Sequence, residues 1–104
     1  MFVQIRTDNR LISDAEANAR LEEKVRAKLK RFAARLSDVE VHITDMNGTK
    51  GGGGDKKVSL EARVNGHAPV AVHADADRVE IAVGLAADKA VRALEHAIGK
   101  EKAH

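Results

Sequence analysis

The chain has 104 residues, 43% of them hydrophobic, which is enough for one domain with a modest core. It contains no cysteine, which excludes disulfides, thiol nucleophiles and Cys-based zinc sites. It lacks a run long enough to span a membrane and an N-terminal signal peptide, so we expect a cytoplasmic protein with no membrane partner. The net charge is +2, but residues 1–57 hold 12 Lys and Arg against 9 Asp and Glu, whereas residues 58–104 hold 6 against 7. This imbalance favours a cationic patch over general basicity.

The first third of the chain predicts a strand followed by a long helix. Residues 2–6 alternate as a short strand, with Val3 and Ile5 facing inward. A capping-box pattern predicts a helix that begins at Ser13 and runs to about Leu36. The apolar stripe of this helix has spacings of 4, 4, 3 and 4 and comprises Leu21, Val25, Leu29, Phe32 and Leu36.

The rest of the chain predicts three strands and a second helix. In chain order these are a strand at 39–45, a strand at 57–64, a strand at 69–74 and a helix at about 78–100. Asn65-Gly66 predicts a hairpin, because both residues tolerate positive φ. Pro69 cannot donate a ladder hydrogen bond and therefore suits the start of an edge strand.

The resulting order, β-α-β-β-β-α, predicts an α+β fold. Because all four strands alternate, the sheet should have one dry and one wet face, and both amphipathic helices should cover the dry face. We expect a two-layer sandwich with a four-stranded sheet, formed as a single domain over residues 1–104.

The first predicted helix carries a ridge of basic residues beside its apolar stripe. The ridge repeats the spacing of the stripe one residue earlier, at Arg20, Lys24, Lys28, Arg31 and Arg35. A cationic ridge beside a buried stripe is what a helix needs to lie against a polyanion. The alternative interpretation, that the ridge is an ordinary solvated face, stays open from this segment alone.

The last helix has a weaker polar ridge. Its members are Lys89, Arg92, His96 and Lys100. Asp88 lies four residues before Arg92 and Glu95 three residues after it, so these charges could pair within the helix. If the two helices are neighbours, the two ridges could form one patch.

The residues give no signature of an enzyme, a cofactor or a metal site. The glycine-rich loop at 50–57 fails the P-loop pattern and reads better as a flexible linker. His42 and His73 should both face the wet side of the sheet, separated by one intervening strand, and therefore look like surface histidines rather than metal ligands. We expect no cofactor, no metal and no small-molecule substrate.

The wet sheet face also argues against base reading in the manner of an RRM. It offers Gln4, Arg6, Glu40, His42, Thr44, Ser59, Glu61, Arg63, Ala71 and His73, and no aromatic side chain on which a base could stack. If RNA binds, it should therefore bind at the helices, through phosphates and shape.

The chain resembles the ribosome hibernation promoting factors, also called ribosome-associated inhibitors or sigma-54 modulation proteins. The resemblance covers nearly the whole chain and lies in the element order, the helix LEEKVRAKLKRFAARL, the hairpin VSLEARVNG followed by VAVHADA, and the Asp88-Lys89 pair. The chain has no C-terminal extension with a second dimerisation domain, so it looks like a short form. Pro69 and the charges near it argue against open strand pairing, and we expect a monomer.

The resemblance implies a protein that binds the small ribosomal subunit in the mRNA and tRNA channel during starvation or stationary phase. Such a protein blocks translation and favours stored, inactive ribosomes. In this family the basic residues of both helices face ribosomal RNA, a role that would fall on Lys24, Lys28, Arg31, Arg35, Lys89 and Arg92. With the remaining members of the two ridges, the predicted 16S rRNA contacts are Arg20, Lys24, Lys28, Arg31, Arg35, Lys89, Arg92, His96 and Lys100.

Two other function classes stay open from the residues. One is a different RNA-binding module, of the double-stranded RNA type, which would bind free duplex RNA as well as ribosomes. The other is a protein-interaction domain whose charged helices are only solvated and which binds no RNA.

Overall fold

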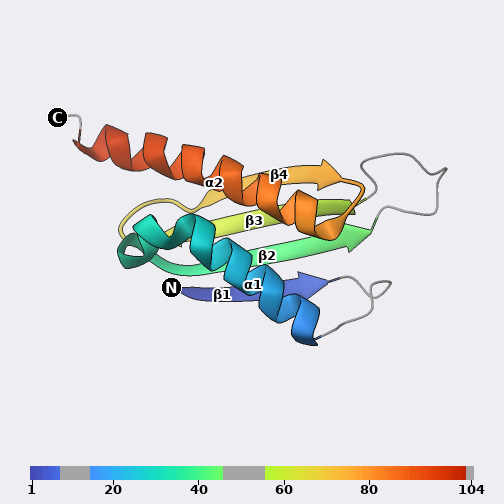
Figure 1. The fold of residues 1–104 in the computed structure, drawn as a ribbon. Coiled ribbons are helices and arrows are strands. Elements are labelled where there is room, and N and C mark those ends of the chain that lie inside the picture. Colours follow the sequence, from blue (N-terminus) through green and yellow to red (C-terminus); the bar gives the residue numbers. More distant parts are fainter. Residues whose placement is uncertain (8–14, 46–55, 103–104) are drawn as a thin grey trace.

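A computed structural model describes residues 1–7, 15–45 and 56–102, and it has the predicted order β-α-β-β-β-α (Figure 1). The elements are β1 (Phe2–Thr7), α1 (Ala15–Leu29), the 3₁₀-helix η1 (Lys30–Arg35), β2 (Leu36–Asp45), β3 (Lys56–Val64), β4 (Val70–Ala76) and α2 (Val79–Lys102). The predicted α+β class is confirmed. The predicted helix start at Ser13 and the glycine-rich loop up to residue 55 lie outside the described residues.

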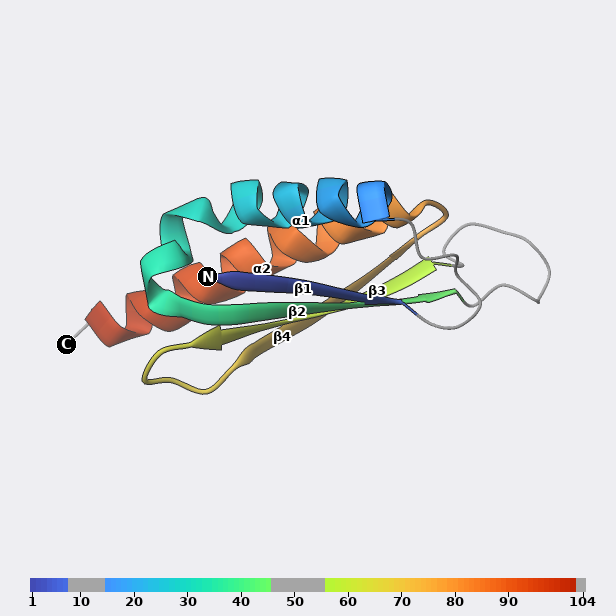
Figure 2. The ribbon, with the colours of Figure 1, turned by 90° about the horizontal axis from the view of Figure 1, so that it is seen from below.

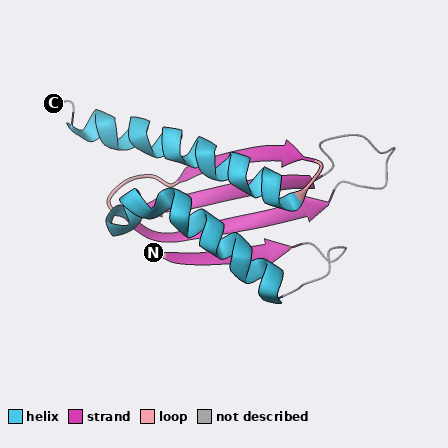
Figure 3. Cartoon of the chain, viewed as in Figure 1, coloured by secondary structure: helices cyan, strands magenta, loops and turns pink. Residues whose placement is uncertain are grey.

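The four strands form one mixed sheet in the order β1-β2-β3-β4 (Figure 3). β1 pairs with β2 in parallel, while β2 with β3 and β3 with β4 are antiparallel. A parallel pair needs a crossover connection, which α1 provides between β1 and β2. β4 pairs with β3 alone and is an edge strand, as Pro69 at its start predicts.

Both helices lie on the same face of the sheet, as Figure 2 shows in side view. Alternate strand residues point toward the helices and are almost fully buried, among them Val41, Leu60 and Ala62. From the helix side, α1 contributes Leu21, Val25 and Leu29, and α2 contributes Ala82, Val83, Ala86, Ala87, Ala90 and Leu94. Alanines let α2 lie close to the strands, and among the described residues no polar or charged residue is buried. No helix in the described part of the chain is long and apolar enough to cross a membrane.

The first helix ends differently from its prediction. The α-helix stops at Leu29, and two 3₁₀ turns carry the chain to Arg35, where an uninterrupted α-helix to Leu36 was expected. The Leu36 N–H donates to the Ala33 carbonyl and closes the last tight turn, so Leu36 itself is already the first residue of β2. Both geometries bury Leu36, which is why the apolar spacing did not distinguish them.

The chain turns between β3 and β4 at Asn65-Gly66, as predicted, but only Gly66 has a positive φ, of 80°. Asn65 keeps a negative φ, so the turn does not use the left-handed tolerance of both residues. The Asn65 N–H donates instead to the Arg35 carbonyl at 2.9 Å. This bond ties the hairpin to the junction between η1 and β2.

The two leucines of α2 provide a matched test of this core. Leu94 is fully buried, whereas Leu85, on the same helix, is 43% exposed. We expect Leu94→Ala to lower the free energy of unfolding by about 2–5 kcal/mol, through lost burial and the cavity left behind. Leu85→Ala should change it by less than about 1 kcal/mol. Urea titration followed by circular dichroism measures both, and equal losses would contradict the assigned orientation of α2.

Candidate nucleic-acid interface

The basic ridge of α1 and η1 runs along the flank that adjoins α2 and is partly exposed to solvent. Leu21, Val25 and Leu29 point into the core, so the ridge, one residue earlier in each turn, lies on the flank of α1 next to α2. The two helices are neighbours on the sheet (Figure 1). We call their line of contact the helix seam and define it by Lys24, Lys28 and Arg31 on one side and Gly84, Asp88 and Glu95 on the other.

Two ion pairs cross the helix seam. The Lys28 Nζ atom lies 2.7 Å from Asp88 Oδ1, and an Nη2 donor of Arg31 bonds to Glu95 Oε2. The two carboxylates therefore pair across the helix seam rather than with Arg92 inside α2, the pairing that their spacing also allowed. On α2, positions 88 and 95 differ by seven residues, close to two full turns, so both carboxylates project toward α1.

Arg31 has a second contact that fixes its position. Its guanidinium carbon lies 4.9 Å from the centre of the Phe32 ring, which is almost fully buried. A cation over an aromatic face is attracted by the ring quadrupole. The guanidinium is therefore held between the ring of Phe32 and the carboxylate of Glu95, and it keeps donors beyond the one that Glu95 engages.

The end of the Lys24 side chain lies against α2 at Gly84. A β-carbon built on Gly84 would lie 3.1 Å from Lys24 Cε and 3.4 Å from its Nζ. The absence of a side chain at position 84 thus lets the lysine lie against the α2 backbone. No carboxylate among the described residues forms an ion pair with Lys24, which makes it the one cation of the helix seam with no acidic partner there.

The remaining predicted site residues are dispersed over the helix layer. Arg20 is exposed and lines a shallow hollow between the first turns of the two helices, and Arg35 is half-buried at the end of η1. Lys89 points to the other side of α2, where its Nζ donates to the His73 carbonyl at 2.9 Å. Arg92 and His96 are exposed, and Lys100 lies near the end of α2 with its side chain outside the described part of the structure. The two ridges therefore do not merge into one uninterrupted cationic patch, because Asp88 and Glu95 lie between the ridge of α1 and Arg92.

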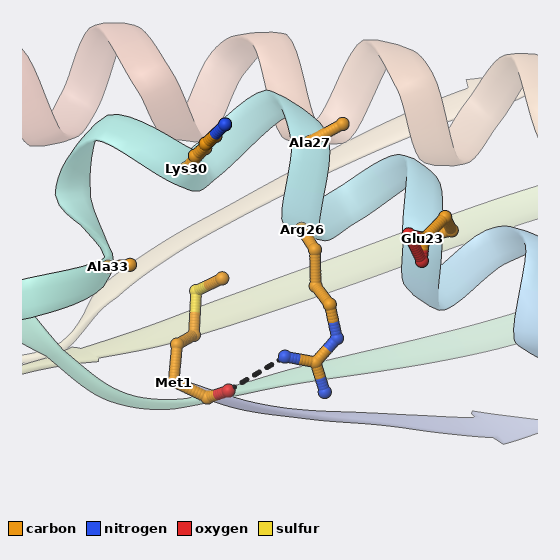
Figure 4. A pocket seen from close by; sticks show the side chains of 6 residues that line it. All are labelled: Met1, Glu23, Arg26, Ala27, Lys30 and Ala33. Carbon is orange, nitrogen blue, oxygen red and sulfur yellow. Dashed lines mark hydrogen bonds between the residues drawn. The ribbon is translucent and has the colours of Figure 1, made fainter.

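Two further cations lie on the opposite flank of α1, above β1. Arg26 donates from Nη1 to the Met1 carbonyl at 2.9 Å, and Lys30 is exposed one turn later. With Glu23 and three apolar side chains they line a surface hollow (Figure 4). Arg26 and Lys30 do not share the helical spacing of the ridge, so the spacing alone did not indicate them. Both nevertheless belong to the acid-free run from Lys24 to Arg35.

Charge separates the two faces of the molecule. Residues 15–35 carry seven Lys and Arg against three Glu, a formal +4, and residues 79–99 of α2 carry two basic against three acidic residues. The outward sheet face carries Arg6, Lys57 and Arg63 against Asp38, Glu40, Glu61 and Asp75, a formal −1. The helix layer is therefore the cationic side, and its excess comes from α1 and η1.

Most charged side chains of the outward sheet face form ion pairs with one another. Arg6 pairs with Glu40 at 2.8 Å, and Arg63 lies 3.5 Å from Glu61 and 3.7 Å from Asp38. The expectation that this face holds no aromatic side chain is wrong, because Phe2 shares the face of Gln4 and Arg6 and is 63% exposed. One ring at the corner of the sheet still falls short of the central pair of aromatics that an RRM uses.

His42 and His73 lie on opposite sides of Ser59 in the register, so β3 separates them as predicted. Within the described residues no group of three or more His, Cys, Asp or Glu side chains is placed to hold a metal ion.

Apart from Phe2, two large hydrophobic side chains of the described chain are exposed, and both lie on α2. They are Ile81, 46% exposed, and Leu85, 43% exposed, one turn apart and on either side of Gly84 in the sequence.

The fold and its cationic helix layer define a two-layer α+β protein of the β-α-β-β-β-α type. Residues 3–102 match the model of the family described as sigma 54 modulation protein / S30EA ribosomal protein, and the chain belongs to that family. The resemblance that the sequence suggested is thereby confirmed, and the family is one of ribosome-associated proteins.

Two solved structures have a similar fold. The N-terminal domain of Protein Y from Thermus thermophilus is 18% identical, with 92% of this chain and 98% of that chain covered and a TM-score of 0.63. A ribosomal subunit interface protein from Coxiella burnetii is 24% identical, with both chains fully covered and a TM-score of 0.64. No protein with a curated description matches the sequence significantly.

The close approach at Gly84 can be tested against a second glycine of α2. A β-carbon at Gly99 would meet open space, so Gly99→Ala should raise the free energy of unfolding by about 0.5–1 kcal/mol through helix propensity. Gly84→Ala should gain less, because the end of Lys24 must move by a few tenths of an ångström. Thermal unfolding of both variants measures the difference. A larger gain at position 84 would contradict the contact with Lys24.

Proposed function

We propose that this protein binds the small ribosomal subunit through its helix layer and inhibits translation by occupying the mRNA and tRNA channel. The contacts are made by Lys and Arg side chains with phosphates of 16S rRNA, and no bond is made or broken. Membership of a ribosome-associated family supports the ribosome as partner. Such a factor acts in the cytoplasm, where ribosomes are.

The observation that carries this proposal is the charge asymmetry between the two faces. Seven basic residues along α1 and η1 give the helix layer a local excess, whereas the outward sheet face has a formal charge of −1. A polyanion is attracted to the first surface and gains nothing from the second. The sheet face also lacks the stacking platform that single-stranded RNA needs, so the helix layer is the better surface for RNA.

The mechanism follows from phosphate chemistry. Each Lys or Arg that reaches a phosphate releases a condensed counterion, which makes binding strongly dependent on salt and only weakly dependent on base sequence. Inhibition then needs only occupancy, because a bound protein in the channel excludes mRNA and tRNA. Arg20 and Lys24, which have no acidic partner among the described side chains, are the cations most ready to make such contacts.

Sucrose-gradient co-sedimentation with bacterial small subunits tests the proposal. We expect co-migration at low salt, with a log–log slope of association against salt of roughly −4 to −5 for about six phosphate contacts. Subunits loaded beforehand with mRNA and tRNA should bind less protein. A protein that stays at the top of the gradient at low salt is not a ribosome binder, and equal binding to loaded subunits would reject the channel.

A pair of neutralising variants tests which face binds. Arg20→Gln with Lys24→Gln should weaken association and make the slope shallower by about 1.5, because two phosphate contacts are lost. The matched control is Arg6→Gln with Lys57→Gln, which removes the same charge from the outward sheet face. Charge reversal at Lys28 and Arg31 is a poorer test, because the new carboxylates would face Asp88 and Glu95 across the helix seam. An equal loss in the control would show that net charge, rather than the helix layer, governs binding.

A further inference from the structure

The helix seam poses a problem for any polyanion that binds there. Two cations of the ridge, Lys28 at the end of α1 and Arg31 in η1, already have carboxylate partners on α2. Phosphate and carboxylate compete for the same ammonium and guanidinium donors. A phosphate that binds Lys28 or Arg31 therefore competes with Asp88 or Glu95 for the same cation.

The exchange of the two carboxylates for phosphates requires little free energy. The side chains of Lys28 and Asp88 are 36% and 44% exposed, and those of Arg31 and Glu95 are 62% and 48% exposed. Pairs this exposed are screened by water and salt and contribute little to folding. These ion pairs orient Lys28 and Arg31 but are weak enough for another anion to replace the carboxylates.

Arg31 is suited to such an exchange. The contact of its guanidinium with the Phe32 ring does not involve Glu95, so replacing the carboxylate by a phosphate does not require that contact to break. Glu95 engages an Nη2 donor, and the planar group presents further donors to a phosphate. Phe32 and Glu95 thus keep a phosphate-binding arginine oriented before any phosphate arrives.

We propose that Asp88 and Glu95 are affinity-determining residues that act as internal substitutes for phosphate. In the free protein they occupy Lys28 and Arg31, and on binding they give way to phosphates of the RNA. The bound complex is weaker than the ridge alone would make it, chiefly by the cost of breaking two ion pairs. This inference rests on the proposed function, because it concerns the same interface.

Neutralising the two carboxylates tests the exchange. Asp88→Asn with Glu95→Gln should bind small subunits more tightly, by about tenfold at fixed salt, because two exposed ion pairs no longer compete. The matched control is Glu40→Gln with Glu61→Gln, which changes net charge equally on the outward sheet face, where the two residues lie opposite each other in the register. The control should bind within about twofold of the unaltered protein. Equal tightening in both variants would overturn the proposal.

A double-mutant cycle separates exchange from simple repulsion. In a background of Lys28→Met and Arg31→Met, the tightening caused by Asp88→Asn and Glu95→Gln should largely disappear, because no cation is left to release. Tightening that persists in full in this background means that the carboxylates only repel RNA, and the exchange is then wrong. Circular dichroism of each variant, with its thermal midpoint, establishes that the fold is kept.

The outcomes also distinguish this inference from the proposed function. If the unaltered protein does not bind small subunits at low salt, the proposed function fails. If it binds, but the two neutralised carboxylates leave its affinity unchanged, the ribosome interface stands and the role of Asp88 and Glu95 is refuted.

Discussion

The burial of one face of the sheet is the constraint on which the rest of this structure depends. The alternating strands present a continuous apolar surface, and two helices must cover it. The alanines of α2 and the branched side chains of α1 satisfy that need from the inner sides of the helices. Each helix is then left with its flanks and outer side for polar residues. The positive excess of the molecule lies on those surfaces, and the proposed function rests on how it is arranged there.

The helices meet through charged side chains and a glycine, rather than through an apolar seam alone. Lys24 lies against Gly84, and the next contacts along the seam are the two ion pairs. A seam of this kind adds little to stability compared with the core beneath it. It does fix where the basic side chains point, and Arg31 over Phe32 is the clearest case. The helix seam is thus ordered by weak contacts on top of a strong core.

Much of this fold could be predicted from the sequence, because period and burial agree along most of the chain. The alternation in β3 is compatible with a strand alone, and the spacing of Leu21, Val25 and Leu29 is compatible with a helix alone, if these apolar residues are to be buried. The end of the first helix could not be predicted, since Leu36 is buried both as a helical residue and as the first residue of β2. Phe2 lies two residues before Gln4 in an alternating strand and therefore shares its face, so the prediction of a sheet face without aromatic side chains fails at this position.

The site was harder to predict, for a reason of physics. Charge pairs inside one helix can be listed from spacing, but pairs between helices depend on how two cylinders are rotated against each other. Asp88 and Glu95 satisfy the spacing rule for Arg92 and nevertheless pair with Lys28 and Arg31. A sequence shows which charges are present on a surface, and the packing of the core decides which of them meet.

The complete absence of buried polar residues in the described part of the chain bears on how such a protein changes over generations. Each buried position of this fold needs only an apolar residue of suitable size, and many sequences meet this requirement. Surface charges can then be gained or lost, a residue at a time, while the backbone keeps its course. Chains that share 18% and 24% of their residues with this one can for that reason keep the same fold. Across lineages, the surface charges can therefore change separately from the architecture that carries them.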